Sequence, residues 1–104
     1  MRRALPLLAL VFGAAACGEP APTDPLAQRG RQVYLSQCIA CHAPDPAQAG
    51  PLGPPVKGSS RELLEAKIVR GTYPPGYRPQ RPTAVMPVQP GAAPEIAALA
   101  EFLK

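Results

Sequence analysis

Two thiols and the only imidazole of the chain lie within five consecutive positions. The segment SQCIACHA, residues 36–43 of this 104-residue sequence, contains Cys38, Cys41 and His42. On a helical turn, residues three positions apart point in the same direction, so the sulfurs of Cys38 and Cys41 can meet one flat partner. His42 follows directly and is placed to bind a metal at the centre of that partner. This spacing predicts a planar, metal-containing group attached through two cysteines.

The pattern Cys-x-x-Cys-His is the attachment signature of c-type haem, in which the thiols form thioethers with two vinyl groups and the imidazole binds the iron. Two other kinds of site use the same residue types. A zinc site needs four ligands, and beyond these three the sequence offers only the distant Cys17. A thioredoxin-like dithiol follows a strand, whereas a helix is expected before Cys38. One covalently bound haem c is therefore the predicted cofactor.

The second axial ligand of the iron can be argued by elimination. His42 is the only histidine, and Met86 is the only methionine besides Met1, which is expected to leave with a signal peptide. Met86 lies in TAVMPVQP, a proline-rich loop without helical or strand periodicity. A lone methionine more often fills a gap in a core, but a haem with one vacant axial position favours ligation. We therefore predict His42 and Met86 as iron ligands. The reduction potential is expected on the positive side of the range found for haems.

The first sixteen residues have the pattern of a secretory signal peptide. A short basic start precedes thirteen apolar or small residues, interrupted by Pro6, and this run is too short to span a bilayer. An ordinary buried helix is the alternative interpretation. Residues 1–16 are therefore predicted to be removed from an exported protein.

Cleavage after Ala16 would make Cys17 the first residue of the mature chain. The segment AAACG resembles the lipobox of bacterial lipoproteins, whose cysteine carries a lipid, although Ala14 stands where that family usually has leucine. Ordinary signal-peptidase cleavage at the same place is the alternative. The resemblance implies a lipid anchor at Cys17 on the periplasmic or other extracytoplasmic side of a bacterial membrane. Residues 17–25 would be a proline-rich tether, and residues 26–104 the folded domain.

The net charge of the chain bears on which partners it binds, and its length bears on how its core is filled. Loss of residues 1–16 removes two arginines and no acidic residue, so the formal charge falls from +4 to +2. Nucleic acid is therefore not suggested as a partner. The remaining chain is short enough to bury only a modest fraction of its surface, and domains of this size often depend on a metal or cofactor. The haem is expected to fill part of the core.

Hydrophobic spacing predicts three helices and no convincing strand, which indicates an all-α fold. The first helix begins with Asp24 as N-cap and Pro25 in the first turn. Its predicted inner side is formed by Leu26, Gly30, Val33, Tyr34 and Gln37.

The second helix is expected to begin at Ser59, with Glu62 completing a capping box, and to end at Gly71. The third covers residues 94–104, with apolar residues at positions 96, 99, 100 and 103. Segments 43–58 and 72–94 are dense in proline and glycine and are predicted to be loops.

The chain from about residue 26 to 104 resembles class I cytochrome c. The segment GRQVYLSQCIACH is similar to that family's Gly-x-x-x-aromatic-x-x-x-Cys-x-x-Cys-His pattern, through Gly30 and Tyr34. In the family, this glycine lets the C-terminal helix cross closely and pack an aromatic side chain, here Phe102. The resemblance implies the small class I cytochrome c fold, with helices wrapped around one haem and one haem edge near the surface.

Two loops carry further parts of the resemblance. GPPVKG, residues 53–58, resembles the family's Gly-Pro-x-Leu-x-Gly segment, in which the proline carbonyl accepts a hydrogen bond from the proximal histidine. This implies that Pro54 holds the ring of His42, with Pro51 as the competing register. VMPVQP resembles the family's Met-Pro segment and supports Met86 as a ligand.

With both axial positions filled by the chain, the iron would have no open position for a substrate. We therefore expect a carrier rather than an enzyme, which passes one electron between periplasmic or membrane redox proteins through a small, transient interface. It would act as a monomer or as a subunit of a respiratory complex. Two alternatives stay open: a subunit fixed in a dehydrogenase or terminal oxidase complex, and a haem sensor or enzyme with an open distal site.

Six basic residues stand against two acidic ones between positions 57 and 81, so an acidic partner surface could steer docking. A solvated helix face with one arginine paired to a haem propionate explains the same residues. Arg78 and Arg81 in GYRPQRP are the expected propionate contacts, because they lie in the loop leading to Met86. Tyr73 and Tyr77 are expected to line that loop, although tyrosine in such a turn can be simple packing.

Overall fold

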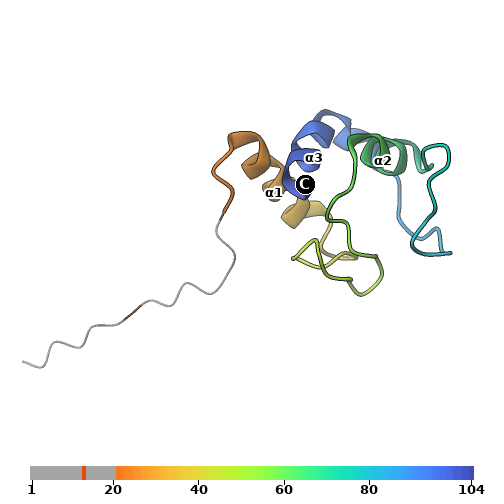
Figure 1. The fold of residues 1–104 in the computed structure, drawn as a ribbon, viewed down its shortest axis with the longest axis horizontal. Helices are drawn as coiled ribbons and strands as arrows, with labels where there is room; N and C mark the ends of the chain where they lie inside the picture. The colour runs from red at the N-terminus through yellow and green to blue at the C-terminus, as the bar shows by residue number, and fades with distance from the viewer. Residues whose placement is uncertain (1–12, 14–20) are drawn as a thin grey trace, which may run out of the picture.

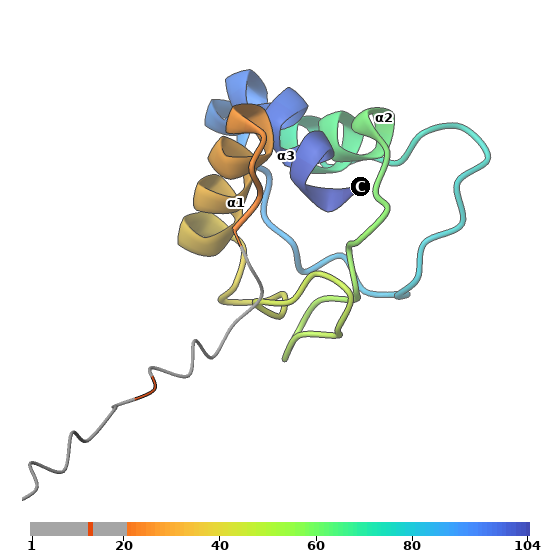
Figure 2. The same ribbon diagram turned by 60° about the vertical axis from the view of Figure 1, so that its left-hand side comes forward.

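A computed structural model describes residue 13 and residues 21–104 of the chain. It contains α1 (Pro25–Gln37), α2 (Arg61–Leu64), the π-helical η1 (Glu65–Val69), the 3-10 segment η2 (Pro90–Glu95) and α3 (Ile96–Leu103). Figures 1 and 2 show the three α-helices gathered together, with long loops extending from them. These described residues contain no strand, and the predicted all-α class is confirmed.

The N-terminal predictions fall almost entirely outside this part of the chain. The predicted signal peptide, apart from Gly13, and Cys17 lie outside the described residues, as does the first half of the tether. Among residues 21–104, no helix has both the length and the apolar character needed to cross a membrane.

Helix α1 begins as predicted, because the Asp24 carboxylate accepts hydrogen bonds from the backbone nitrogens of Leu26, at 3.4 Å, and Ala27, at 3.2 Å. The predicted inner side needs correction at both ends. Leu26 is 45 % exposed and Gln37 is exposed. The buried residues of α1 are Ala27, Gly30, Val33 and Tyr34. The small residues Ala27 and Gly30 leave room for another helix, so this side of α1 is the one that packs against it.

Helix α3 crosses α1 at Gly30. A Cβ atom at this position would overlap the carbonyl oxygen of Ala98 and lie 2.8 Å from the Cβ of Phe102. One turn further, the rings of Tyr34 and Phe102 pack with centroids 5.5 Å apart. The glycine and the aromatic pair predicted for this crossing are therefore present and in contact.

The predicted start of the second helix was wrong by one residue. Ser60 is the N-cap, and its hydroxyl accepts from the backbone nitrogen of Leu63 at 3.1 Å. Ser59 instead donates its hydroxyl hydrogen to the carbonyl of Val56, at 2.6 Å, and closes the preceding turn. The predicted Ser59 to Glu62 capping box therefore does not form. The predicted stop is present, because Gly71 has a φ of 68°, which favours glycine.

The third helix is shorter than predicted at its start, because Pro94 belongs to η2 and α3 begins at Ile96. Its inner residues join the core. The core cluster combines residues from all five helical elements: Val33, Tyr34, Leu64, Ile68, Ala92, Ile96, Leu99 and Leu103. Cys38 and Met86 pack against the edge of this cluster, which places both sulfur atoms beside the main core.

Candidate cofactor site

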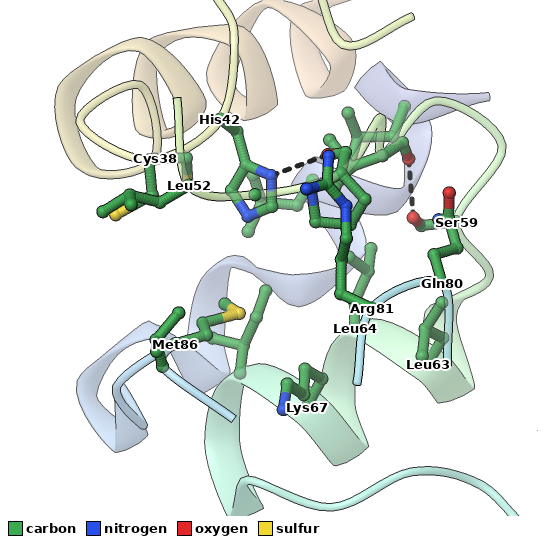
Figure 3. A pocket seen from close by; sticks show the side chains of 18 of the residues that line it. Cys38, His42, Leu52, Ser59, Leu63, Leu64, Lys67, Gln80, Arg81 and Met86 are labelled. Atoms are coloured by element: carbon green, nitrogen blue, oxygen red, sulfur yellow. Dashed lines mark hydrogen bonds between the residues drawn. The ribbon is translucent and has the colours of Figure 1, made fainter. Parts of the chain in front are cut away.

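A large cavity opens beside the core, between the helices and the two long loops. The space inside it and at its open mouth together is about 1010 Å³. Its walls are mainly apolar, and five core residues form part of them: Tyr34, Leu64, Ile68, Leu99 and Leu103. Figure 3 shows His42 and Met86 reaching this space from separate segments of the chain.

The Cys-x-x-Cys-His segment continues from the end of α1 as one tight turn. The backbone nitrogen of Cys38 donates to Tyr34 at 3.0 Å, and those of Cys41 and His42 donate to the Cys38 carbonyl at 3.3 and 2.9 Å. Both cysteines are partly buried free thiols that line the cavity. Burial raises the pKa of the Cys38 thiol above its ordinary value. The turn thus presents both sulfurs and the imidazole to the same space.

The ring of His42 is held in one orientation. It is only 9 % exposed, and its Nδ1 lies 2.9 Å from the carbonyl oxygen of Pro54. Because a carbonyl can only accept, Nδ1 is the donor, and the lone pair of the neutral ring is on Nε2, available to a metal. Gly53 lies against the ring, since a Cβ there would come within 2.5 Å of Nδ1. The exposed Pro51, the competing register, does not supply this carbonyl.

Backbone hydrogen bonds tie the loop after His42 to the cysteine turn. The nitrogens of Leu52 and Gly53 donate to the Cys41 carbonyl at 3.2 and 2.9 Å. The hydroxyl of Tyr34 donates to the carbonyl of Ala43, directly after His42. Sequence reasoning treated Tyr34 only as an aromatic residue and missed this bond. The signal was available in the residue type, because tyrosine differs from phenylalanine by this one hydroxyl.

The Tyr34 hydroxyl is protonated at neutral pH and acts as a hydrogen-bond donor. Burial, with smaller contributions from the nearby Cys38 and Asp45, raises the pKa of Tyr34 to about 12. The tyrosine is 2 % exposed. It therefore joins α1 to the histidine-bearing turn from inside the core.

The loop between η1 and η2 supplies the other wall of the cavity. Met86 is partly buried there and lines the cavity together with Tyr77 and Arg81. Arg78, the other expected propionate contact, is exposed and is not among the lining residues. The structure therefore brings Cys38, Cys41, His42, Pro54, Met86, Tyr77 and Arg81 to one cavity and leaves Arg78 outside it.

Two lining residues of this region were missed by sequence reasoning. Lys67 points its Nζ at the ring of Tyr73, 4.5 Å from the centroid. Gln80 donates from Nε2 to the carbonyl of Pro55 at 3.0 Å, which links the Met86 loop to the His42 loop. The Gln80 contact has no local sequence signal, because it joins residues 25 positions apart. Lys67 reaches Tyr73 across the end of the helix, a place where regular helical spacing no longer applies.

The donor set fits a c-type haem. Two thiols and an Nε2 lone pair lie on one segment, a thioether lies on another, and the walls between them are mainly apolar. The lining carries two cations, Lys67 and Arg81, and no acidic residue. Within residues 21–104, no group of three or more histidine, cysteine, aspartate and glutamate side chains is arranged to hold a metal ion directly. The zinc alternative therefore finds no ligand set in the described part of the chain.

Comparison with known proteins agrees with this geometry. Residues 27–104, about three quarters of the chain, match the family model described as cytochrome c. No curated protein matches the chain.

Proposed function

The chain belongs to the cytochrome c family, and we propose that it is a one-electron carrier whose haem iron is held by His42 and Met86. The family binds haem c covalently and serves haem-based electron transfer, and Cys38 and Cys41 have the spacing of its attachment motif. When bound, the haem supplies a reversible one-electron change at its iron. The residues of this chain determine whether the iron keeps an open coordination position for any other reaction.

The observation that carries the proposal is the convergence of His42 and Met86 on one cavity. The Pro54 carbonyl orients His42 with Nε2 available, and Met86 lies against the core on the separate loop. With both as ligands, no coordination position is left for a substrate or for oxygen, so electron transfer is favoured over catalysis. The carbonyl of Pro54 would also hold the imidazole of His42 in the orientation that a metal ligand needs.

The cavity mouth suits a transient redox partner. Leu52 is 59 % exposed and Val85 is 65 % exposed, and both line the cavity. They give it an apolar rim where a haem edge would approach the surface, as expected for a small docking interface. Arg81 and Tyr77 line the same cavity, and we propose Arg81 as the partner of a haem propionate.

Replacing Met86 with alanine tests the ligation. The oxidised wild-type protein is expected to show the weak near-infrared charge-transfer band of methionine sulfur on ferric haem. Met86→Ala is expected to lose this band, to lower the reduction potential because a thioether ligand favours ferrous iron, and to bind carbon monoxide when reduced. Absorption spectra and a redox titration of the haem-matured proteins measure all three.

Val85→Ala is the matched control, since it shortens the neighbouring side chain on the same loop and should leave the band in place. A wild-type protein that lacks the band and takes up carbon monoxide at once has an open distal site. That result would replace the carrier by a haem sensor or enzyme.

We further propose that the protein is exported and held to a membrane by lipid on Cys17. Cytochrome c domains are typically exported, and the segment AAACG carries the support for lipidation. Residues 17–25 would then be a short tether, with the haem domain close to the membrane. A tethered carrier would relay electrons between partners on the same membrane, as a monomer or within a respiratory complex.

Changing Cys17 tests the anchor. Wild-type protein expressed in a bacterial host is expected in the membrane fraction, with the mass of a lipid on its N-terminal residue. Cys17→Ala should move the protein to the soluble exported fraction with its haem unchanged, whereas Gly18→Ala should behave as wild type. Fractionation and intact-mass spectrometry provide the readout. An unmodified wild-type N-terminus contradicts the anchor.

A further inference from the structure

The loop that carries Met86 is an arch whose two ends rest on the same short helical segment. At one end, the backbone nitrogen of Thr72 donates to Ala66 at 3.0 Å. At the other end, the nitrogen of Gln89 donates to Ile68 at 2.6 Å. Both acceptors belong to η1, and Figures 1 and 2 show the loop extending away from the helices and returning toward them. Residues 78–85 between these ends are all exposed, so few contacts decide where Met86 lies.

The sequence YPPGY forms a tight turn at the start of the arch. The nitrogen of Tyr77 donates to the Pro74 carbonyl at 3.1 Å, and Gly76 has a φ of 76° at the third position of this turn. Proline followed by glycine with positive φ is the pattern of a type II turn. The turn brings Tyr73 and Tyr77 face to face, with centroids 5.4 Å apart and planes within 13°. The two rings therefore stack on each other.

Lys67 joins this pair of rings to η1. Its Nζ lies 4.5 Å from the centre of the Tyr73 ring, within the range of a cation–π contact. The ion pairs among residues 21–104 are Arg29 with Glu95, Arg70 with Glu65 and Lys104 with Glu101, so none of them includes Lys67. Among these residues, the Tyr73 ring is thus the partner that the structure shows for the Lys67 ammonium group. Lys67, Tyr73 and Tyr77 together line the cavity that Met86 also lines.

We propose that Lys67 is a positioning residue for Met86 and acts through the Tyr73–Tyr77 stack. The cation holds the stack against η1, and the stack fixes the first part of the arch. The contact from Gln80 to Pro55 then guides the chain toward the His42 loop before it reaches Met86. Without the cation, the arch opens more often and Met86 leaves the iron more often. This inference rests on Met86 being the ligand, as proposed above.

Binding of imidazole to the ferric, haem-loaded protein tests the proposal, because imidazole can bind the iron only after Met86 has left. Lys67→Gln removes the cation, and Tyr73→Leu removes the ring. Both are expected to raise the observed rate of imidazole binding about tenfold, the order expected for loss of one partly buried cation–π contact. Both should also weaken the near-infrared methionine band.

Conservative variants distinguish a positioning role of Lys67 and Tyr73 from a general effect of changing charge or side-chain size. Lys67→Arg keeps a cation and Tyr73→Phe keeps a ring, so both should stay within about twofold of wild type. Arg61→Gln makes the same change of charge at an exposed position of α2 and should also remain near wild type. Suppose that wild type shows the methionine band and that all variants bind imidazole at the same rate. This result would overturn the inference and leave the proposed function intact. Equal effects of Lys67→Gln and Arg61→Gln on that rate would have the same meaning. Absence of the band in wild type would instead refute Met86 ligation, and the inference with it.

Discussion

A chain with both Cys38 and Cys41 replaced by alanine is expected to carry no covalent haem and to lose most of its helical structure. The thioethers can form only at these two sulfurs, which lie on one turn at the cavity. The loss of structure follows from the core, because five of its eight clustered residues also line the cavity. Without haem these side chains would lose their apolar contacts with it, and so small a domain has little other apolar contact to offset this loss.

Two measurements check this result. Haem-dependent staining after denaturing electrophoresis reports the covalent bond, and far-ultraviolet circular dichroism reports the helices. Cys17→Ala is the matched control, since it removes the third cysteine of the chain and should leave both signals unchanged. Staining that survives in the double variant would show attachment through another residue.

Gly30→Ala is expected to destabilise the folded protein by about 3 kcal/mol, the upper end of the cost of overpacking. The new methyl group would overlap the carbonyl oxygen of Ala98, a backbone atom that cannot move away by changing a rotamer. Helix propensity alone predicts the opposite sign, because alanine is favoured over glycine inside a helix by roughly 1 kcal/mol. The direction of the change therefore distinguishes close helix crossing from local helix stability.

Guanidinium unfolding of the ferric protein measures this effect. Gly91→Ala is a suitable control, because Gly91 is exposed and a Cβ there would have no neighbour within 4 Å. It should change stability by less than about 0.5 kcal/mol. A Gly30→Ala protein as stable as wild type would mean that α3 does not cross α1 at this residue.

The chemistry of the site was predictable because it depends on residue types at short spacing. Cys38, Cys41 and His42 lie on one turn, so their joint use follows from local geometry alone. The N-cap at Asp24 and the helix end at Gly71 are similarly local, and both agree with the structure. Gly30 and Phe102 were indicated by the family pattern, and the crossing of α1 and α3 places them in contact.

The sequence by itself thus determined the attachment motif, the candidate axial ligands and the all-α class. The tertiary structure decided which of several similar residues has each role. Ser60 caps α2 because Ser59 closes the preceding turn, and Arg81 lines the cavity whereas Arg78 does not. The loop after His42 presents the carbonyl of Pro54, and not that of Pro51, to the imidazole.

The contacts of Tyr34, Lys67 and Gln80 were likewise decided by the tertiary structure. The reason is physical: a motif within one turn is set by backbone geometry, whereas these contacts leave a helix or a loop and depend on how the chain continues beyond it.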